Sequence, residues 1–204
     1  MPITEFLERN ARLYPNDVSL VEINPANQPE RNITWREYNL IEASESEKYR
    51  REMTWREFDV KANRFANFLF TRGIKKGDKV AILLMNCLEW LPIYFGILKS
   101  GALAVPMNFR YSADEIEYCL DLADVDVLVF GPEFTERLES VPNAIDRLKI
   151  KFFVGRDVPS FAESYLEMVT FCSTKAPPVM LSETDHAAIY FSSGTTGRPK
   201  AILH

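Results

Sequence analysis

Hydroxyl groups, glycines and cations gather near the end of the sequence, where residues 192–200 read S-S-G-T-T-G-R-P-K. Four of these residues carry hydroxyls, and the two glycines let backbone N–H groups approach an anion without a Cβ in the way. Lys200 adds a mobile positive charge, and no acidic residue occurs between Ile189 and Leu203. The stretch therefore predicts a phosphate-binding loop in a chain whose formal net charge is -5.

The spacing of this predicted phosphate loop differs from that of the Walker loop, G-x-x-x-x-G-K-[ST]. Arg198 and Pro199 separate the last glycine from Lys200, and no hydroxyl follows the lysine. Residues 187–191 have the short, apolar, β-branched and aromatic composition of a buried strand. We therefore expect a loop between two strands, although the stretch after Lys200 is expected to be too short a strand to anchor the loop.

With its flanking residues, the string Y-F-S-S-G-T-T-G-R-P-K resembles the phosphate-binding signature of the adenylate-forming acyl-CoA synthetase and ligase superfamily, [ST]-S-G-[ST]-T-G-x-P-K-G. The hexapeptide S-S-G-T-T-G alone is also typical of a solvated turn, but the longer match favours the resemblance. Ala201 departs from the family's usual glycine. In that register the histidine of the family's next strand falls two positions after His204, so His204 is not its counterpart.

The resemblance implies a binding role for a set of residues in this loop. The β- and γ-phosphates of ATP would be bound by Ser192, Ser193, Gly194, Thr195, Thr196 and Gly197. Ser192 would also contact Mg²⁺, and Lys200 would contact the phosphates as the catalytic residue of the stretch.

The family's reaction gives the expected function. In the family, a carboxylate attacks the α-phosphate of ATP, pyrophosphate leaves, and a thiol, most often coenzyme A, takes the acyl group. The resemblance thus implies the N-terminal part of an AMP-forming acyl-CoA synthetase, inactive alone, with ATP, Mg²⁺ and coenzyme A as cofactors. Two alternatives stay open, which are an adenylation domain that loads a carrier protein and a truncated non-catalytic fragment. The acid substrate cannot be identified, because the family's acyl pocket follows the phosphate loop.

The composition is that of an ordinary globular protein. With 47% hydrophobic and 26% charged residues and a pI of about 5.2, it speaks against disorder and against a nucleic-acid surface. Cys87, Cys119 and Cys172 are too far apart in sequence to suggest a zinc cluster or a disulfide framework. The first residues lack the pattern of a signal peptide, so we expect a cytoplasmic protein. Its partners would be a carboxylic acid, ATP and coenzyme A, with a homodimer as the oligomer to test.

Residues 80–98 are apolar enough to imitate a membrane span and contain a single charge, Glu89. Asn86, Glu89 and Pro92 interrupt the run, which instead indicates a short strand followed by a helix over residues 88–100 with Asn86 as its N-cap. We therefore predict no transmembrane segment.

The sequence contains one internal repeat, R-N-I-T-W-R-E-Y at residues 31–38 and R-E-M-T-W-R-E-F at residues 51–58. The second copy continues into an apolar helical pattern that stops at Gly73, whereas the first runs into the charged stretch E-A-S-E-S-E-K. The family normally has one copy of this element. Residues 24–50 are therefore expected to be a surface insertion.

Patterns typical of strands and helices alternate along the rest of the chain. Helices are expected over residues 4–13, 88–100, 112–123 and 161–169, and strands over 18–23, 80–84, 101–105, 125–130 and 151–154. This alternation predicts an α/β fold with a largely parallel sheet and crossover helices. Residues 86–108 also resemble a second sequence motif of the family. Residues 1–204 are therefore expected to form the N-terminal part of its AMP-binding domain. Asn86, Glu89 and Asn108 are interpreted as cap and turn residues.

Overall fold

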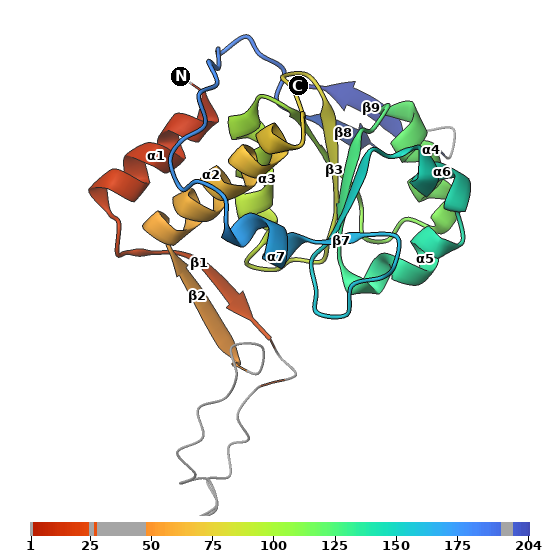
Figure 1. Cartoon of the computed structure of the whole chain (residues 1–204), viewed down its shortest axis with the longest axis horizontal. Helices are drawn as coiled ribbons and strands as arrows, with labels where there is room; N and C mark the ends of the chain where they lie inside the picture. The colour runs from red at the N-terminus through yellow and green to blue at the C-terminus, as the bar shows by residue number, and fades with distance from the viewer. Residues whose placement is uncertain (1, 25–26, 28–47, 193–197) are drawn as a thin grey trace, which may run out of the picture.

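A computed structural model of the protein describes residues 2–24, 27, 48–192 and 198–204. A five-stranded parallel sheet lies at its centre, in the order β4-β3-β5-β6-β7, with helices on both faces (Figure 1). The strands are β3 Lys79–Leu83, β4 Leu103–Pro106, β5 Val127–Phe130, β6 Ile150–Phe153 and β7 Glu163–Ser164. The predicted α/β fold with a largely parallel sheet is confirmed.

Strand β3 is buried on both sides, and its residues divide between two hydrophobic cores. Val80 and Ile82 belong to one core, and Ala81 and Leu83 to the other, because successive side chains of a strand point to opposite faces. Helices α2 (Trp55–Thr71), α3 (Trp90–Ser100) and α7 (Tyr165–Thr170) cover the first face. Helices α4 (Ala113–Leu122), α5 (Thr135–Glu139) and α6 (Pro142–Arg147) cover the second, with the short turn η4 (Pro132–Phe134).

Gly96 lets α2 and α3 approach closely. A Cβ at this position would lie 2.9 Å from the carbonyl oxygen of Ala62 and 2.9 Å from Cβ of Phe65. Both contacts are shorter than real Cβ atoms tolerate, so a larger residue would push the helices apart. The glycine in the middle of α3 thus costs helix propensity but permits this close approach of α2 and α3.

The helix predicted over residues 112–123 is confirmed as α4, and a capping box forms its start. The hydroxyl of Ser112 accepts a hydrogen bond from the backbone N–H of Glu115 (3.3 Å), whose carboxylate accepts one from the N–H of Ser112 (2.9 Å). Thr54 and Glu57 form the same capping box at the start of α2, directly after β2 (Arg50–Thr54). The second T-W-R-E copy therefore contains the last residue of β2, which is also the N-cap of α2, and the first three residues of that helix.

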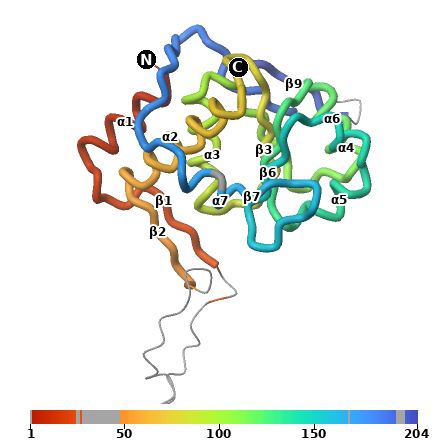
Figure 2. The backbone as a smooth tube through the Cα atoms, viewed as in Figure 1, coloured from red at the N-terminus to blue at the C-terminus, as the bar shows by residue number. Residues whose placement is uncertain are grey.

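The N-terminal helix α1 (Ile3–Leu13) leads into β1 (Val18–Ile23), which pairs antiparallel with β2 in a hairpin that extends away from the helices (Figures 1 and 2). Ile23 pairs with Arg50, and the N–H of Asn24 donates to the carbonyl of Tyr49 (2.8 Å). The two end residues of the expected insertion, Asn24 and Arg50, thus contact this hairpin, and the insertion between them stays a prediction. The first T-W-R-E copy lies outside the described residues.

Two predicted helices have different limits in the structure. Helix α3 begins at Trp90 with Glu89 as its N-cap, so the prediction of a start at residue 88 with Asn86 as the cap is wrong. The preceding residues form a turn instead, in which the N–H of Trp90 donates to the carbonyl of Cys87 (3.2 Å). The helix predicted over residues 161–169 is shortened to α7, because β7 pairs with β6 and Ser164 caps the helix.

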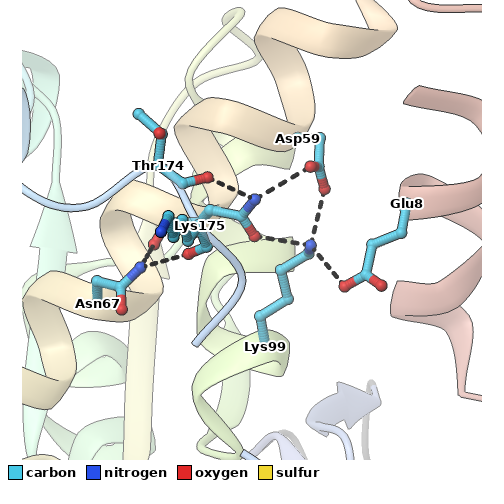
Figure 3. A network of polar contacts seen from close by, with 7 residues as sticks. Glu8, Asp59, Asn67, Lys99, Thr174 and Lys175 are labelled. Atoms are coloured by element: carbon cyan, nitrogen blue, oxygen red, sulfur yellow. Dashed lines mark hydrogen bonds and ion pairs between the residues drawn. The ribbon is translucent and has the colours of Figure 1, made fainter. Parts of the chain in front are cut away.

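A buried lysine joins three helices on the α2–α3 side of the molecule (Figure 3). Nζ of Lys99 lies 2.9 Å from Glu8 of α1, 2.7 Å from Asp59 and 2.8 Å from Oδ1 of Asn63, both on α2. The lysine side chain is 2% exposed, so these acceptors replace the water that its charge would otherwise bind.

Among the helices that the structure describes, none has the length and apolar character needed to cross a membrane.

Candidate phosphate-binding site

The two ends of the predicted phosphate loop lie opposite one another on paired strands. Strand β8 (Ile189–Ser192) and strand β9 (Lys200–Leu203) are antiparallel, and Ser192 is the register partner of Lys200. The prediction of a loop between two strands is confirmed at both ends. Five of the predicted phosphate-binding residues lie outside the described residues: Ser193, Gly194, Thr195, Thr196 and Gly197.

The expectation that the stretch after Lys200 is too short to anchor the loop is wrong. Strand β9 pairs with β8 at all four of its residues, and the ladder continues where the N–H of His204 donates to Ala188 (2.9 Å). A short strand suffices here because its partner is itself attached to the central sheet. The N–H of Ala104 on β4 donates to the carbonyl of Ala187 (3.0 Å), and Ala104 forms a parallel bridge with Ala188.

This attachment decides on which edge of the sheet the loop begins. Because β8 runs parallel to β4 at the bridge, Ser192 lies toward the edge at which β4 and its parallel neighbours end. Ligands of open α/β sheets bind outside the carboxyl ends of the strands. The loop therefore starts at the edge where such a fold places its ligand.

The segment that leads to β8 is tied to α2 by two asparagines (Figure 3). The side-chain N–H groups of Asn63 donate to the carbonyl of Thr174 (3.1 Å), and those of Asn67 donate to the carbonyls of Ser173 (3.1 Å) and Lys175 (2.8 Å). Asn63 also contacts Lys99, so the buried lysine supports this segment as well. These bonds connect the helical layer to the chain that carries the predicted loop.

The described part of the loop carries positive charge and a hydroxyl. Ser192 is half-buried, while Arg198 and Lys200 are exposed and Pro199 between them is buried. The guanidinium of Arg198 lies over the ring of Tyr118, 5.1 Å from its centroid. A serine hydroxyl and a lysine ammonium on adjacent strand positions can bind phosphate oxygens as a hydrogen-bond donor and a point charge.

Two of the three thiols, those of Cys87 and Cys119, are poor nucleophiles near neutral pH. Burial raises the pKa of Cys87 to about 11, with the charge of Glu89 as a further cause, and burial also raises that of Cys119 to about 11. Both thiols are therefore protonated near neutral pH, where only the thiolate is nucleophilic. Within the described part of the chain, no group of three or more His, Cys, Asp or Glu side chains is placed to hold a metal ion.

The structure also shows the side-chain partners of Glu89, Asn108 and Tyr118, three residues outside the predicted loop. Glu89, interpreted from sequence as a cap or turn residue, is the N-cap of α3, yet its carboxylate pairs with Arg51 and Lys61 rather than capping the helix. Asn108 is a turn residue, as predicted, since its side chain accepts from the N–H of Arg110 (3.0 Å). Tyr118 was not indicated by any local pattern, because its partner Arg198 is distant in sequence.

Comparison with known families gives the class of the protein. The sequence model of the family described as AMP-binding enzyme matches residues 7–204. The chain therefore belongs to the AMP-binding enzyme family.

Individual relatives are longer than this chain. A crotonobetaine/carnitine–CoA ligase from Shigella flexneri serotype 5b (strain 8401) is 34% identical over 146 residues, which are 69% of this chain and 28% of that protein. The crystal structure of the anthranilate CoA ligase AuaEII with anthranoyl-AMP superposes with a TM-score of 0.81 at 27% identity, over 100% of this chain and 35% of that chain. The inhibitor-bound N-terminal domain of FACL13 from Mycobacterium tuberculosis gives 0.75 at 25% identity, over 99% of this chain and 44% of that chain.

Proposed function

We propose that this chain is the N-terminal part of an AMP-forming acid–thiol ligase and that it binds the β- and γ-phosphates of ATP. The observation that carries the proposal is the pairing of Ser192 with Lys200 across β8 and β9, in a chain that belongs to the AMP-binding enzyme family. This pairing brings a hydroxyl and a cation to the two ends of a loop rich in glycine and hydroxyls.

Each residue of the loop has a role in the proposal. Backbone N–H groups and hydroxyls of residues 192–197 bind the phosphate oxygens, and Ser192 also contacts the Mg²⁺ that accompanies ATP. Lys200 neutralises negative charge that develops on the leaving pyrophosphate. Mg²⁺ supplies further neutralisation, as in other phosphoryl and nucleotidyl transfers.

The proposed reaction has two half-reactions. A carboxylate oxygen of the acid attacks the α-phosphorus of ATP, the bond from that phosphorus to the bridging oxygen breaks, and pyrophosphate leaves with the electron pair. The thiolate of coenzyme A then attacks the acyl carbonyl, and AMP leaves. The phosphate loop serves the first half-reaction, because no pyrophosphate group is present in the second.

The proposal includes a cellular location and an oligomeric state. A cytoplasmic location is part of the proposal, since ATP and coenzyme A, its proposed nucleotide and thiol substrates, are both present there. A homodimer is the assembly we propose, and light scattering on the purified protein measures it.

The test uses the product of the complete reading frame that contains these 204 residues, called the parent enzyme below. We expect it to exchange labelled pyrophosphate into ATP when supplied with a suitable acid. The acids to compare are carnitine, crotonobetaine, anthranilate and fatty acids of several lengths, chosen from the names of similar proteins. Exchange that depends on one of these acids supports the proposal. A folded parent enzyme that exchanges no pyrophosphate with any of them would overturn it.

A further inference from the structure

Both ends of the phosphate loop contact the region of helix α4. On the side that enters the loop, the ring of Phe191 meets the ring of Tyr111 edge-on, with centroids 6.4 Å apart at 76°. On the side that leaves it, Arg198 lies over the ring of Tyr118. Tyr111 directly precedes the N-cap of α4, and Tyr118 lies in the middle of the helix. One helix and its N-terminal flank therefore support both ends of the loop.

Helix α4 is a rigid support. Its capping box fixes the first turn, and Ile116, Cys119 and Leu120 are buried against the sheet. The tyrosine before the helix is fixed as well, because its carbonyl accepts a hydrogen bond from Arg137 (3.0 Å). A side chain held by α4 is thus tied to the central sheet.

The surface that receives Arg198 is both aromatic and acidic. A groove of about 360 Å³ is lined by Asp114, Glu115, Glu117, Tyr118, Asp121, Arg198 and Pro199. A guanidinium is attracted to the face of a tyrosine ring and to nearby carboxylates. Asp121 is paired with Arg147 (2.5 Å) and Glu115 with the cap of α4, while Asp114 and Glu117 line the same groove.

The position of Arg198 matters because it stands two residues before Lys200. The guanidinium of arginine binds phosphate through two hydrogen bonds, and its long side chain can reach the loop. An unrestrained guanidinium beside the loop therefore competes with Lys200 for the same phosphate oxygens. Stacking on Tyr118 holds the guanidinium against α4 instead. Pro199, which is buried, then continues directly into β9.

We propose that Tyr118 is a positioning residue for the phosphate site: its ring holds Arg198 on α4 and thereby fixes the end of the loop from which Lys200 extends. The inference rests on the proposed function and adds to it a residue that touches neither ATP nor acid. Because the loop serves the first half-reaction, the loss of the ring slows adenylation and leaves the transfer from acyl-adenylate to coenzyme A unchanged.

The kinetic test compares the two half-reactions of the parent enzyme. In Tyr118→Leu we expect the KM for Mg·ATP in pyrophosphate exchange to rise about fivefold, the size of a partly exposed cation–π contact. Transfer to coenzyme A from added acyl-adenylate is expected to stay within about twofold of the parent value. Tyr118→Phe keeps the ring and is expected to restore the KM.

Two further variants distinguish the loss of the Tyr118–Arg198 contact from a general loss of stability or activity. Tyr118→Leu combined with Arg198→Met is expected to be no worse than Tyr118→Leu alone, because the two residues act as one unit. Phe6→Leu is the matched control, since Arg9 lies over that ring at the same 5.1 Å on α1. It is expected to leave the KM for Mg·ATP within about twofold of the parent value.

A measurement on the 204-residue chain makes the test independent of activity. We expect hydrogen exchange of the β9 amides to be faster in Tyr118→Leu than in Tyr118→Phe, with the β5 amides unchanged in both. Equal exchange in the two variants, an unchanged KM in Tyr118→Leu, or equal loss in both half-reactions would overturn the inference while the proposed function stands. A parent enzyme without pyrophosphate exchange would overturn the proposed function itself.

Discussion

Nζ of Lys99 lies 2.7 Å from Oδ1 of Asp59, and this lysine is almost entirely removed from solvent. The pair lies where α1, α2 and α3 meet, and Asn63 connects it to the segment that leads to β8 (Figure 3). A buried ion pair contributes little net stability over apolar residues, but the loss of one partner leaves an uncompensated charge. The stability of this side of the molecule therefore depends on the lysine being present.

Lys99→Met is expected to lower the free energy of unfolding of the 204-residue chain by about 3–5 kcal/mol, because Asp59 loses its buried cation. Urea unfolding measures the change. The control is Lys76→Met, whose ion pair with Asp185 is shorter still (2.5 Å) but has a lysine side chain that is 48% exposed. We expect that variant to cost less than about 1 kcal/mol. A Lys99→Met chain as stable as the control would contradict the prediction.

A second prediction concerns acid sensitivity at Asp126. Its carboxylate accepts from the N–H of Lys79 (2.9 Å) and pairs with Nζ of Lys149 (2.7 Å). Burial alone would raise the pKa of Asp126, but the Lys149 hydrogen bond, the Lys79 N–H and the two charges outweigh burial and lower it. A carboxyl with a lowered folded-state pKa stabilises the protein above its unfolded-state pKa, and this stabilisation is lost as the pH falls through the folded-state value.

Asp126→Asn is therefore expected to lower the Tm at pH 7 and to differ less from the unsubstituted chain as the pH falls below about 4. Thermal unfolding followed by circular dichroism between pH 7 and pH 2.5 measures both. Asp124→Asn serves as the control, because the Asp124 side chain is 90% exposed and its pair with Lys79 is screened by solvent. A pH-independent difference for Asp126→Asn would show that its role is not electrostatic.

How much of the fold could be predicted depends on whether a feature is local. The strand β3 and the capping box at Ser112 were predictable, because a continuous apolar run, typical of a strand buried on both faces, and a hydroxyl three residues before a glutamate are sequence-local signals. The start of α3 was not, because the choice between Asn86 and Glu89 as the cap is made by the ion pairs of Glu89 with β2 and α2. Sequence periodicity carries no information on such partners.

In the candidate site, too, some residues are indicated by local sequence and others depend on distant partners. The loop residues and the strands at its ends follow from composition and from a family signature. Lys99 has no sequence pattern that separates it from a solvated lysine, since its carboxylate partners come from two other helices. The same holds for Tyr118, whose functional interpretation depends on Arg198, a residue that only the folded chain brings to α4.

The third prediction concerns Lys200 in the parent enzyme. Lys200→Ala is expected to slow acid-dependent pyrophosphate exchange by about two to three orders of magnitude, because the charge that develops on pyrophosphate loses its partner. Thr170→Ala on α7 is a control far from the loop in sequence and in the sheet order. Exchange within a factor of about two of the parent rate would remove Lys200 from the site.

The fourth prediction concerns the N-terminal hairpin and the proposed insertion. Replacement of residues 25–48 by Asn-Gly is expected to shift the Tm of the 204-residue chain by less than about 3 °C, because the new turn closes a ladder that already pairs Asn24 with Tyr49. Deletion of the whole of 24–50 is expected to cost more, since it removes Arg50 from β2. Loss of folding in the shorter replacement would show that Trp35 is a core residue.

The last prediction is that the 204-residue chain alone catalyses no adenylation and binds Mg·ATP weakly. The proposed site of Ser192 and Lys200 contacts only the phosphate tail of the nucleotide, and Lys200 is exposed, so its attraction for phosphate is screened by salt. Two features reduce the entropy cost of ordering the loop: the pairing of β8 with β9 and the contact of Arg198 with the ring of Tyr118. Neither of them adds a contact with adenine or ribose. Isothermal titration with Mg·ATP is expected to give a dissociation constant of about 1 mM or weaker, as for a ligand held by a few exposed polar contacts. The Lys200→Ala variant is the control. A dissociation constant in the low micromolar range that this variant abolishes would contradict the prediction and show that these residues form a complete nucleotide site.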